Sequence, residues 1–213
     1  MTEAPLFETS SLQRAFEALR QDLIHPGGPR ISTMRNYRYC MVVYPSREEY
    51  ACRLEAARLA AKLRDIGWVV KSISLQALLL RRLESHGPDY LDRLVAREKA
   101  ATKLDPERGL NLLMQKIQPE IEGPQGLAAE VVREIDDFVT AHPDQAERTL
   151  VLIGRAGALY PFFSASALLK HIDGRTHNIP VVMLYPGERQ GESGLSFMSR
   201  VPPHTDYRPR IYG

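Results

Sequence analysis

Residues 39–73 read YCMVVYPSREEYACRLEAARLAAKLRDIGWVVKSI, the pattern of a strand, a helix and a second strand. The apolar run at 39–44 is typical of a buried strand. Ser46 and the glutamate three residues later have the spacing of a capping box, which predicts a helix that ends at Gly67. The second strand is expected at 68–73. Because parallel strands need a long crossover connection, this stretch predicts an α/β fold with a parallel sheet.

Further elements of both kinds are expected along the rest of the chain. A helix is expected at 11–23, where Ser10 and Gln13 also have capping-box spacing. Two more buried strands are expected at 149–153 and 179–184. Other helices are expected at 75–83, at 89–103, from Pro106 onward, around 127–138, and at 161–171.

Helical spacing also predicts which apolar side chains point inward. For the helix after the first strand, they are Tyr50, Leu54, Ala57 and Ala61. For the helix at 75–83, they are Leu75, Leu78, Leu79 and Leu83. For the helix that opens at Pro106, they are Leu110, Leu113, Met114 and Ile117.

Together these elements predict a single α/β domain over residues 1–213. Its sheet is expected to be a mostly parallel, Rossmann-like open sheet flanked by helices, with a helical insertion at about 75–121. From residue 188 the chain is rich in Gly, Ser and Pro, which predicts an irregular tail over 188–213. This tail is expected to close in an edge strand, because Pro209 cannot donate to a ladder.

Charge and hydropathy limit the classes of function. The chain has 28 basic and 26 acidic residues and a net charge of +2. Direct nucleic-acid binding normally needs a clear basic excess, so this balance argues against it. The sequence shows neither a signal-peptide pattern nor an apolar run of the roughly 20 residues that span a membrane. We therefore expect a cytoplasmic protein with no membrane contact.

The sequence contains none of the common catalytic motifs, such as a nucleophile elbow, a zinc-protease helix or a kinase set. Cys40 and Cys52 lack metal-ligand spacing. His171 and His177, with Asp173 between them, would make only an incomplete metal site. We predict no catalytic residues, no cofactor and no metal.

Three expected strands end in similar turn-forming sequences. The carboxyl ends of parallel strands share one edge, where ligands commonly bind. Helix N-termini expected near Ser46 and Pro161 would offer N–H groups to an anion there. Turn chemistry alone would also account for the prolines and glycines. The candidate residues at this edge are Tyr44, Pro45, Gly154, Arg155, Gly157, Tyr160, Pro161, Tyr185, Pro186, Gly187 and Glu188.

Arginine and tyrosine gather in two other segments, one before the first strand and one near the C-terminus. Both residue types are common anchors of protein interfaces. Solvated segments would be equally compatible with this composition. The candidate partner-binding residues are Arg35, Tyr37, Arg38, Arg200, Tyr207, Arg208, Arg210 and Tyr212.

Two runs resemble a known family. Residues 154–162 read GRAGALYPF, and residues 179–188 read IPVVMLYPGE, followed by Gly191. These runs resemble the BrxB family of BREX phage-defence systems, in which one strand enters a glycine-rich turn ending in Y-P-F and a later strand enters a Y-P-G turn. The chain length and the first strand ending in Tyr-Pro also fit this family.

The resemblance implies an accessory protein of bacterial anti-phage defence, encoded beside a methyltransferase, an ATPase and PglZ, an alkaline-phosphatase-like protein. It implies a non-enzymatic adaptor that binds another BREX component, with PglZ as the leading partner. The residues themselves leave one alternative, a nucleotide- or phosphate-binding enzyme that uses the strand-end edge of the sheet.

Overall fold

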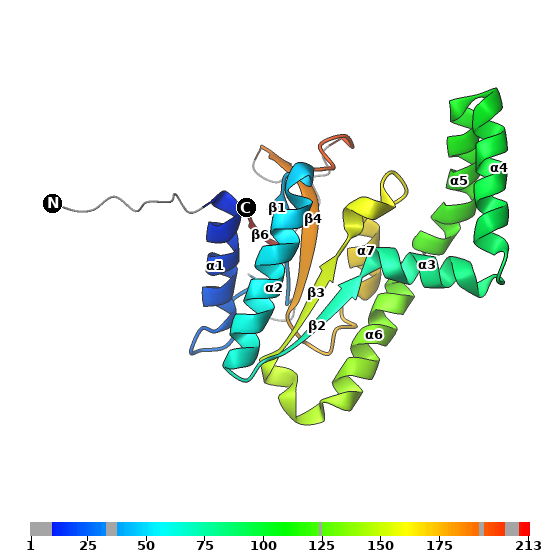
Figure 1. The fold of residues 1–213 in the computed structure, drawn as a ribbon. Coiled ribbons are helices and arrows are strands. Elements are labelled where there is room, and N and C mark those ends of the chain that lie inside the picture. Colours follow the sequence, from blue (N-terminus) through cyan, green and yellow to red (C-terminus); the bar gives the residue numbers. More distant parts are fainter. Residues whose placement is uncertain (1–9, 33–37, 124, 192–193, 203–208) are drawn as a thin grey trace. The chain divides into compact units, whose positions relative to one another are not determined.

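The computed structural model describes residues 10–32, 38–123, 125–191, 194–202 and 209–213. Figure 1 shows the order of helices and strands along the chain. The strands are β1 (Tyr39–Tyr44), β2 (Val69–Ser74), β3 (Thr149–Gly154), β4 (Val181–Gln190), β5 (Gly194–Phe197) and β6 (Arg210–Tyr212). The helices are α1 (Ser11–Leu23), α2 (Glu49–Asp65), α3 (Leu75–Ser85), α4 (Tyr90–Leu104), α5 (Pro106–Ile121), α6 (Leu127–Ala141) and α7 (Ala165–Ile172).

These strands form one sheet in the order β2-β3-β4-β1-β6, and β5 pairs with β4. β1 runs parallel to β4 and to β6, whereas β5 runs antiparallel to β4. The predicted α/β fold with a mostly parallel open sheet is therefore confirmed. β1 and β2, the two strands of the first crossover, are not neighbours, because β3 and β4 lie between them.

The longest parallel pairing joins β1 to β4. It covers six residues, from Tyr39 opposite Val181 to Tyr44 opposite Pro186. Every residue of β1 is buried. Because neighbouring side chains of a strand point to opposite faces, a shift of one residue would exchange both buried sets. Because both sets are apolar, the sequence of β1 predicts a strand buried on both faces but does not by itself select the register.

The chain divides into two compact units. The first comprises residues 1–71, 144–152 and 178–213, and the second comprises residues 72–143 and 153–177. The first holds α1, α2 and most of the sheet, and the second holds α3 to α7. The organisation as a single domain stays a prediction.

In the first unit, α1 and α2 share a hydrophobic core with β1 and β4. The capping box of α1 forms as predicted: the Gln13 amide donates to the Ser10 hydroxyl, and the Ser10 amide donates to the Gln13 side chain, both at 3.1 Å. The inward face of α1 carries Leu12, Phe16, Leu19 and Leu23, all buried. Capping and periodicity thus predict this helix correctly.

The predicted buried face of α2 is wrong. Residues 46–48 form a 3-10 turn, α2 begins at Glu49, and no side chain caps it. Tyr50 and Leu54 are 72% and 41% exposed. Apolar residues occur all round this helix, so periodicity alone does not select the buried face. The buried residues are Cys52, Ala56, Leu59, Ala60 and Leu63.

In the second unit, the middle third is helical as predicted, and the inward face predicted for α3 is confirmed. The inward face predicted for α5 is wrong. Leu110 is 45% exposed, and Leu113, Met114 and Ile117 are only half-buried. The reason is that α5 packs mainly against α4, as a helical hairpin.

Two expectations near the C-terminus also fail. The helix expected at 161–171 begins only at Ala165. The tail from residue 188 is not wholly irregular, because β4 continues to Gln190 and forms a hairpin with β5. The expected edge strand is confirmed, since β6 lies at the end of the strand order beside β1.

The edge strand β6 is tied to α1 through one carboxylate. Tyr212 is 5% exposed, and its hydroxyl donates to Asp22 Oδ2 at 2.8 Å. The Arg210 guanidinium lies 2.7 Å from the same oxygen. Burial, the largest cause, raises the pKa of Tyr212, so this hydroxyl stays protonated in the folded chain.

We expect Tyr212→Phe to lower the free energy of unfolding by about 1 kcal/mol, because Asp22 loses a hydrogen bond. Tyr50→Phe, at an exposed position, is the control and should change nothing. Urea melts measure both. The wild-type chain should also lose stability above about pH 10, where Tyr212 ionises in the unfolded chain first. An unchanged melt for Tyr212→Phe contradicts the prediction.

Candidate functional site

In the first unit, the carboxyl ends of β1 and the buried part of β4 open onto a pocket of about 330 Å³. Of the residues predicted for the strand-end edge, it brings four together: Tyr44, Pro45, Gly187 and Glu188. The other lining residues include Glu48, Arg189 and the C-terminal Gly213. A ligand-binding role for these four residues stays a prediction.

The two tyrosines predicted for this edge are packed rather than exposed. Tyr44 is 2% exposed and its hydroxyl donates to the carboxylate of Glu49. Tyr185 is 1% exposed, and its ring meets the ring of Phe197 edge-on, with 5.4 Å between centroids. Pro186 pairs with Tyr44 across the sheet. These three residues lie inside strands, and the turn expected at residues 185–187 is absent because β5 continues the pairing of β4.

Gly187 is required by the close approach of β5. A Cβ added there would lie 2.2 Å from the carbonyl oxygen of Ser196. No heavy-atom contact of that length is tolerated, so any side chain would force the two strands apart. The Y-P-G sequence therefore serves strand pairing at this position.

The other strand-end residues belong to the second unit. Arg155 follows β3 with a left-handed backbone, φ 64°. Its Nε and Nη2 donate to Gln76 Oε1 at 3.0 and 2.7 Å. Gly157 lies in a 3-10 turn at Ala156–Leu159, which Tyr160 and Pro161 follow. The helix N-terminus expected near Pro161 is absent, because this turn and a short loop precede α7.

The charges at the strand-end pocket do not favour an anion. Glu48 and Glu188 both line it, against one guanidinium from Arg189. A second negative charge within a few ångströms repels a phosphate. The helix expected to open at Ser46 begins instead at Glu49, and its first turn is acidic. The pocket therefore offers little to the phosphate-binding alternative.

Four of the predicted partner-binding residues, Arg35, Tyr37, Tyr207 and Arg208, lie outside the described residues. Of the rest, Arg200 is exposed and Arg38 is half-buried. Arg210 and Tyr212 hold Asp22, as described above. The role of all these residues in partner binding stays a prediction.

Neither cysteine is placed to act as a nucleophile. Cys40 and Cys52 are 0% and 1% exposed. Burial raises the pKa of both thiols, and the carboxylates of Glu49 and Glu48 raise that of Cys52 further. The reactive species is the thiolate, so both groups are held in the unreactive form.

Within the described ranges, no group of three His, Cys, Asp or Glu side chains could hold a metal ion. His177 contacts Asp136 instead, with 2.6 Å from Nε2 to Oδ1. Among the described helices, none has the length and apolar character to cross a membrane.

A family model described as BREX protein BrxB matches residues 71–211. The match spans both runs that carry the resemblance, residues 154–162 and 179–188. The chain belongs to the BrxB family. As a BrxB-family protein, it is a component of a BREX system. No curated protein and no solved structure matches the chain.

We expect Gly187→Ala to lower the free energy of unfolding by roughly 1–3 kcal/mol, because the added methyl overlaps the Ser196 carbonyl. Thermal or urea melts measure the loss. A melt unchanged from wild type would show that the β4–β5 pairing is looser than this distance requires.

Both thiols should resist iodoacetamide in the folded protein at neutral pH, because they are buried and protonated. In denaturant, both should react. Mass spectrometry counts the modified cysteines under each condition. Rapid labelling of Cys52 in the native protein, without loss of fold, is the result that contradicts this prediction.

Proposed function

We propose that this BrxB-family chain is a non-enzymatic adaptor of a BREX system, acting in the cytoplasm, and that its leading partner is the PglZ-family protein. The observation that carries this proposal is the apolar surface of the α4–α5 hairpin, in the second unit. Sequence reasoning placed part of that surface in the core.

The two helices of the hairpin lie side by side (Figure 1). A Cβ added at Gly109 would lie 1.9 Å from Thr102 Oγ1, so the helices approach each other closely at this glycine. In α4 only Leu94 is buried, and in α5 only Gly109 and Ile121. The hairpin therefore contributes little to a core of its own.

Large apolar side chains of the hairpin are left in solvent. Leu104 is 76% exposed, Val95 is 47% exposed and Leu110 is 45% exposed. Leu104 and Leu110 flank the turn between the helices, at the end away from α3 and α6 (Figure 1). Burying such side chains against a partner contributes about 1.5–3 kcal/mol each.

The opposite end of the hairpin is held in place by charged groups. Arg82 of α3 lies 3.0 Å from Glu120 of α5 and 3.0 Å from Glu130 of α6. His86 lies 2.8 Å from Glu120 as well. All three members of the arginine network are about four-fifths buried, which strengthens their attraction relative to solvent-exposed pairs. A surface carried on a braced hairpin loses little conformational freedom on binding.

The test is co-purification of the tagged chain with co-expressed BREX proteins. We expect the PglZ-family protein to be retained by the wild-type chain. Leu104→Asp and Leu110→Asp should weaken that binding by roughly 30-fold or more, because loss of an anchor costs about 2 kcal/mol. Leu54→Asp makes the same change at an exposed leucine of the first unit, and should bind normally.

The remaining outcomes separate the parts of the proposal. Retention of the ATPase or the methyltransferase in place of the PglZ-family protein rejects that partner and keeps the adaptor role. Loss of binding in Arg200→Ala but not in Leu104→Asp moves the interface to the C-terminal arginines. Retention of no BREX protein by the wild-type chain overturns the adaptor. Circular dichroism melts confirm that each variant is folded.

A further inference from the structure

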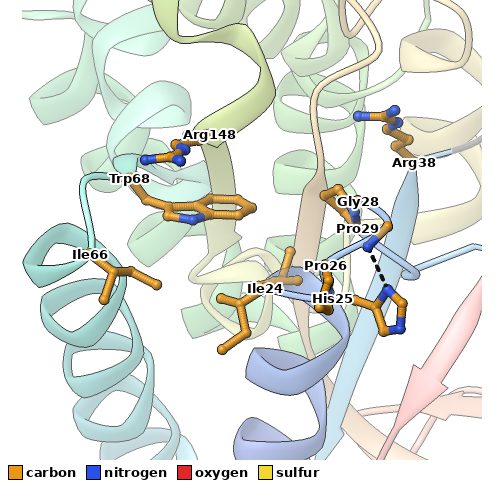
Figure 2. Close-up of a pocket in the computed structure, with 11 residues that line it drawn as sticks. Ile24, His25, Pro26, Gly28, Pro29, Arg38, Ile66, Trp68 and Arg148 are labelled. Carbon is orange, nitrogen blue, oxygen red and sulfur yellow. Dashed lines mark hydrogen bonds between the residues drawn. The ribbon is translucent and has the colours of Figure 1, made fainter.

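The first unit has a second and larger pocket, of about 630 Å³, at the opposite end of the strands (Figure 2). It lies where α1 and α2 end and where β1, β2 and β3 begin. Small-molecule sites commonly have volumes of roughly 300–1,000 Å³, so this pocket is of the right size for a ligand. Of the residues predicted from the sequence, Arg38, expected to bind a partner, lines this pocket, whereas a ligand site was expected at the other end of the strands.

Three lining residues occupy equivalent places in the sequence. Arg38 directly precedes β1, Trp68 directly precedes β2, and Arg148 directly precedes β3. The Arg38 carbonyl accepts the amide of Val181 at 2.8 Å, and the Trp68 amide donates to the Leu63 carbonyl at 3.0 Å. The backbones of Arg38 and Trp68 are therefore held by the sheet and by the end of α2. Their side chains extend from fixed backbone positions.

The pocket is positively charged. Arg38 and Arg148 both line it, and none of the described side chains that line it belongs to an aspartate or glutamate. Within the part of the chain that the structure describes, neither guanidinium forms an ion pair, whereas Arg20, Arg82 and Arg210 each do. Guanidinium groups match the geometry of phosphate oxygens and bind them by paired hydrogen bonds.

His25 adds a hydrogen-bond donor to the same pocket. Its Nδ1 accepts the amide of Gly27 at 3.0 Å, the contact drawn as a dashed line in Figure 2. A neutral ring in this arrangement carries its proton on Nε2, so Nε2 is the donor. Two carbonyls at the adjoining helix ends have local partners: the Arg20 carbonyl accepts the amide of Ile24, and the Arg64 carbonyl accepts the amide of Gly67. These carbonyls therefore do not need the two arginines.

The rest of the wall is apolar. Trp68 is 8% exposed, and Figure 2 shows its indole beside Arg148, with Ile24 and Ile66 nearby. Ile66 is 48% exposed although it lies at the pocket. A flat ring placed against these side chains would cover them from water, and bases pack well on aromatic side chains. The two guanidinium groups would match an anionic group of a ligand, and the apolar wall would match a ring.

We propose that this pocket binds a nucleoside phosphate, with the base against Trp68 and Ile66, beside Arg148, and the phosphate extending across the pocket toward Arg38. The site lies wholly in the first unit, whereas the surface proposed for partner binding lies in the second. The two proposals can therefore fail independently.

The chain has a single tryptophan, and it lines this pocket. Its fluorescence therefore reports on this site alone. We would titrate the full chain with AMP, GMP, ATP, GTP, inorganic phosphate, and a short oligonucleotide with a terminal phosphate. The expected result is a saturable change in Trp68 emission with at least one nucleotide, at lower concentration than with inorganic phosphate. Tighter binding of the oligonucleotide than of the free nucleotide identifies a nucleic-acid end as the source.

Arg38→Gln and Arg148→Gln should each raise the Kd about tenfold, the loss expected for a charge-assisted hydrogen bond. Arg97→Gln removes the same charge from an exposed position in α4 and should leave the Kd unchanged. Matching melting temperatures confirm that the variants are folded. Three results overturn the proposal: no saturable change in the wild-type chain, a change that both pocket variants retain in full, or equal affinity for inorganic phosphate.

Discussion

The parallel pairing of β1 with β4 holds both pockets of the first unit in place. Its six residue pairs are buried, and a shift by one residue would turn two apolar faces inside out. The Arg38 carbonyl closes one end of this ladder, and the pair of Tyr44 with Pro186 closes the other. The amino-end pocket and the carboxyl-end pocket therefore lie at the two ends of strand β1.

Charge distinguishes these two ends. The carboxyl-end pocket carries Glu48 and Glu188, while the amino-end pocket carries Arg38 and Arg148. Ligands of open α/β sheets commonly bind at the carboxyl ends, partly because helix N-termini lie there. In this chain α2 starts with acidic residues, which reverses the usual preference at that edge. The position of a pocket in the fold and the charge that lines it are separate properties, and the second decides the class of ligand.

Most short-range patterns predict the structure correctly, one exception being the capping box expected at Ser46, which does not form. The capping box at Ser10, the apolar run of β1 and the leucines of α3 are confirmed cases. Long-range packing decides the features that the sequence did not predict. The buried face of α2 depends on its neighbours, because this helix has apolar residues on every side. The extension of β4 past Gly187 depends on pairing with β5, which comes later in the chain. Of the strand-end residues, four meet in one pocket. Of the amino-end pocket only Arg38 was predicted, as a partner-binding residue, although an arginine or tryptophan directly before each of three strands was a visible signal of a shared site.

Packing constrains the two units unequally. In β1 every side chain is enclosed, so nearly any substitution there disturbs the sheet. In the α4–α5 hairpin three residues are buried, and most of the remaining surface contributes little to the free energy of unfolding. Sequence change can therefore accumulate on the hairpin faster than in the sheet. A protein built in this way can follow a diverging partner over evolutionary time while its fold stays the same.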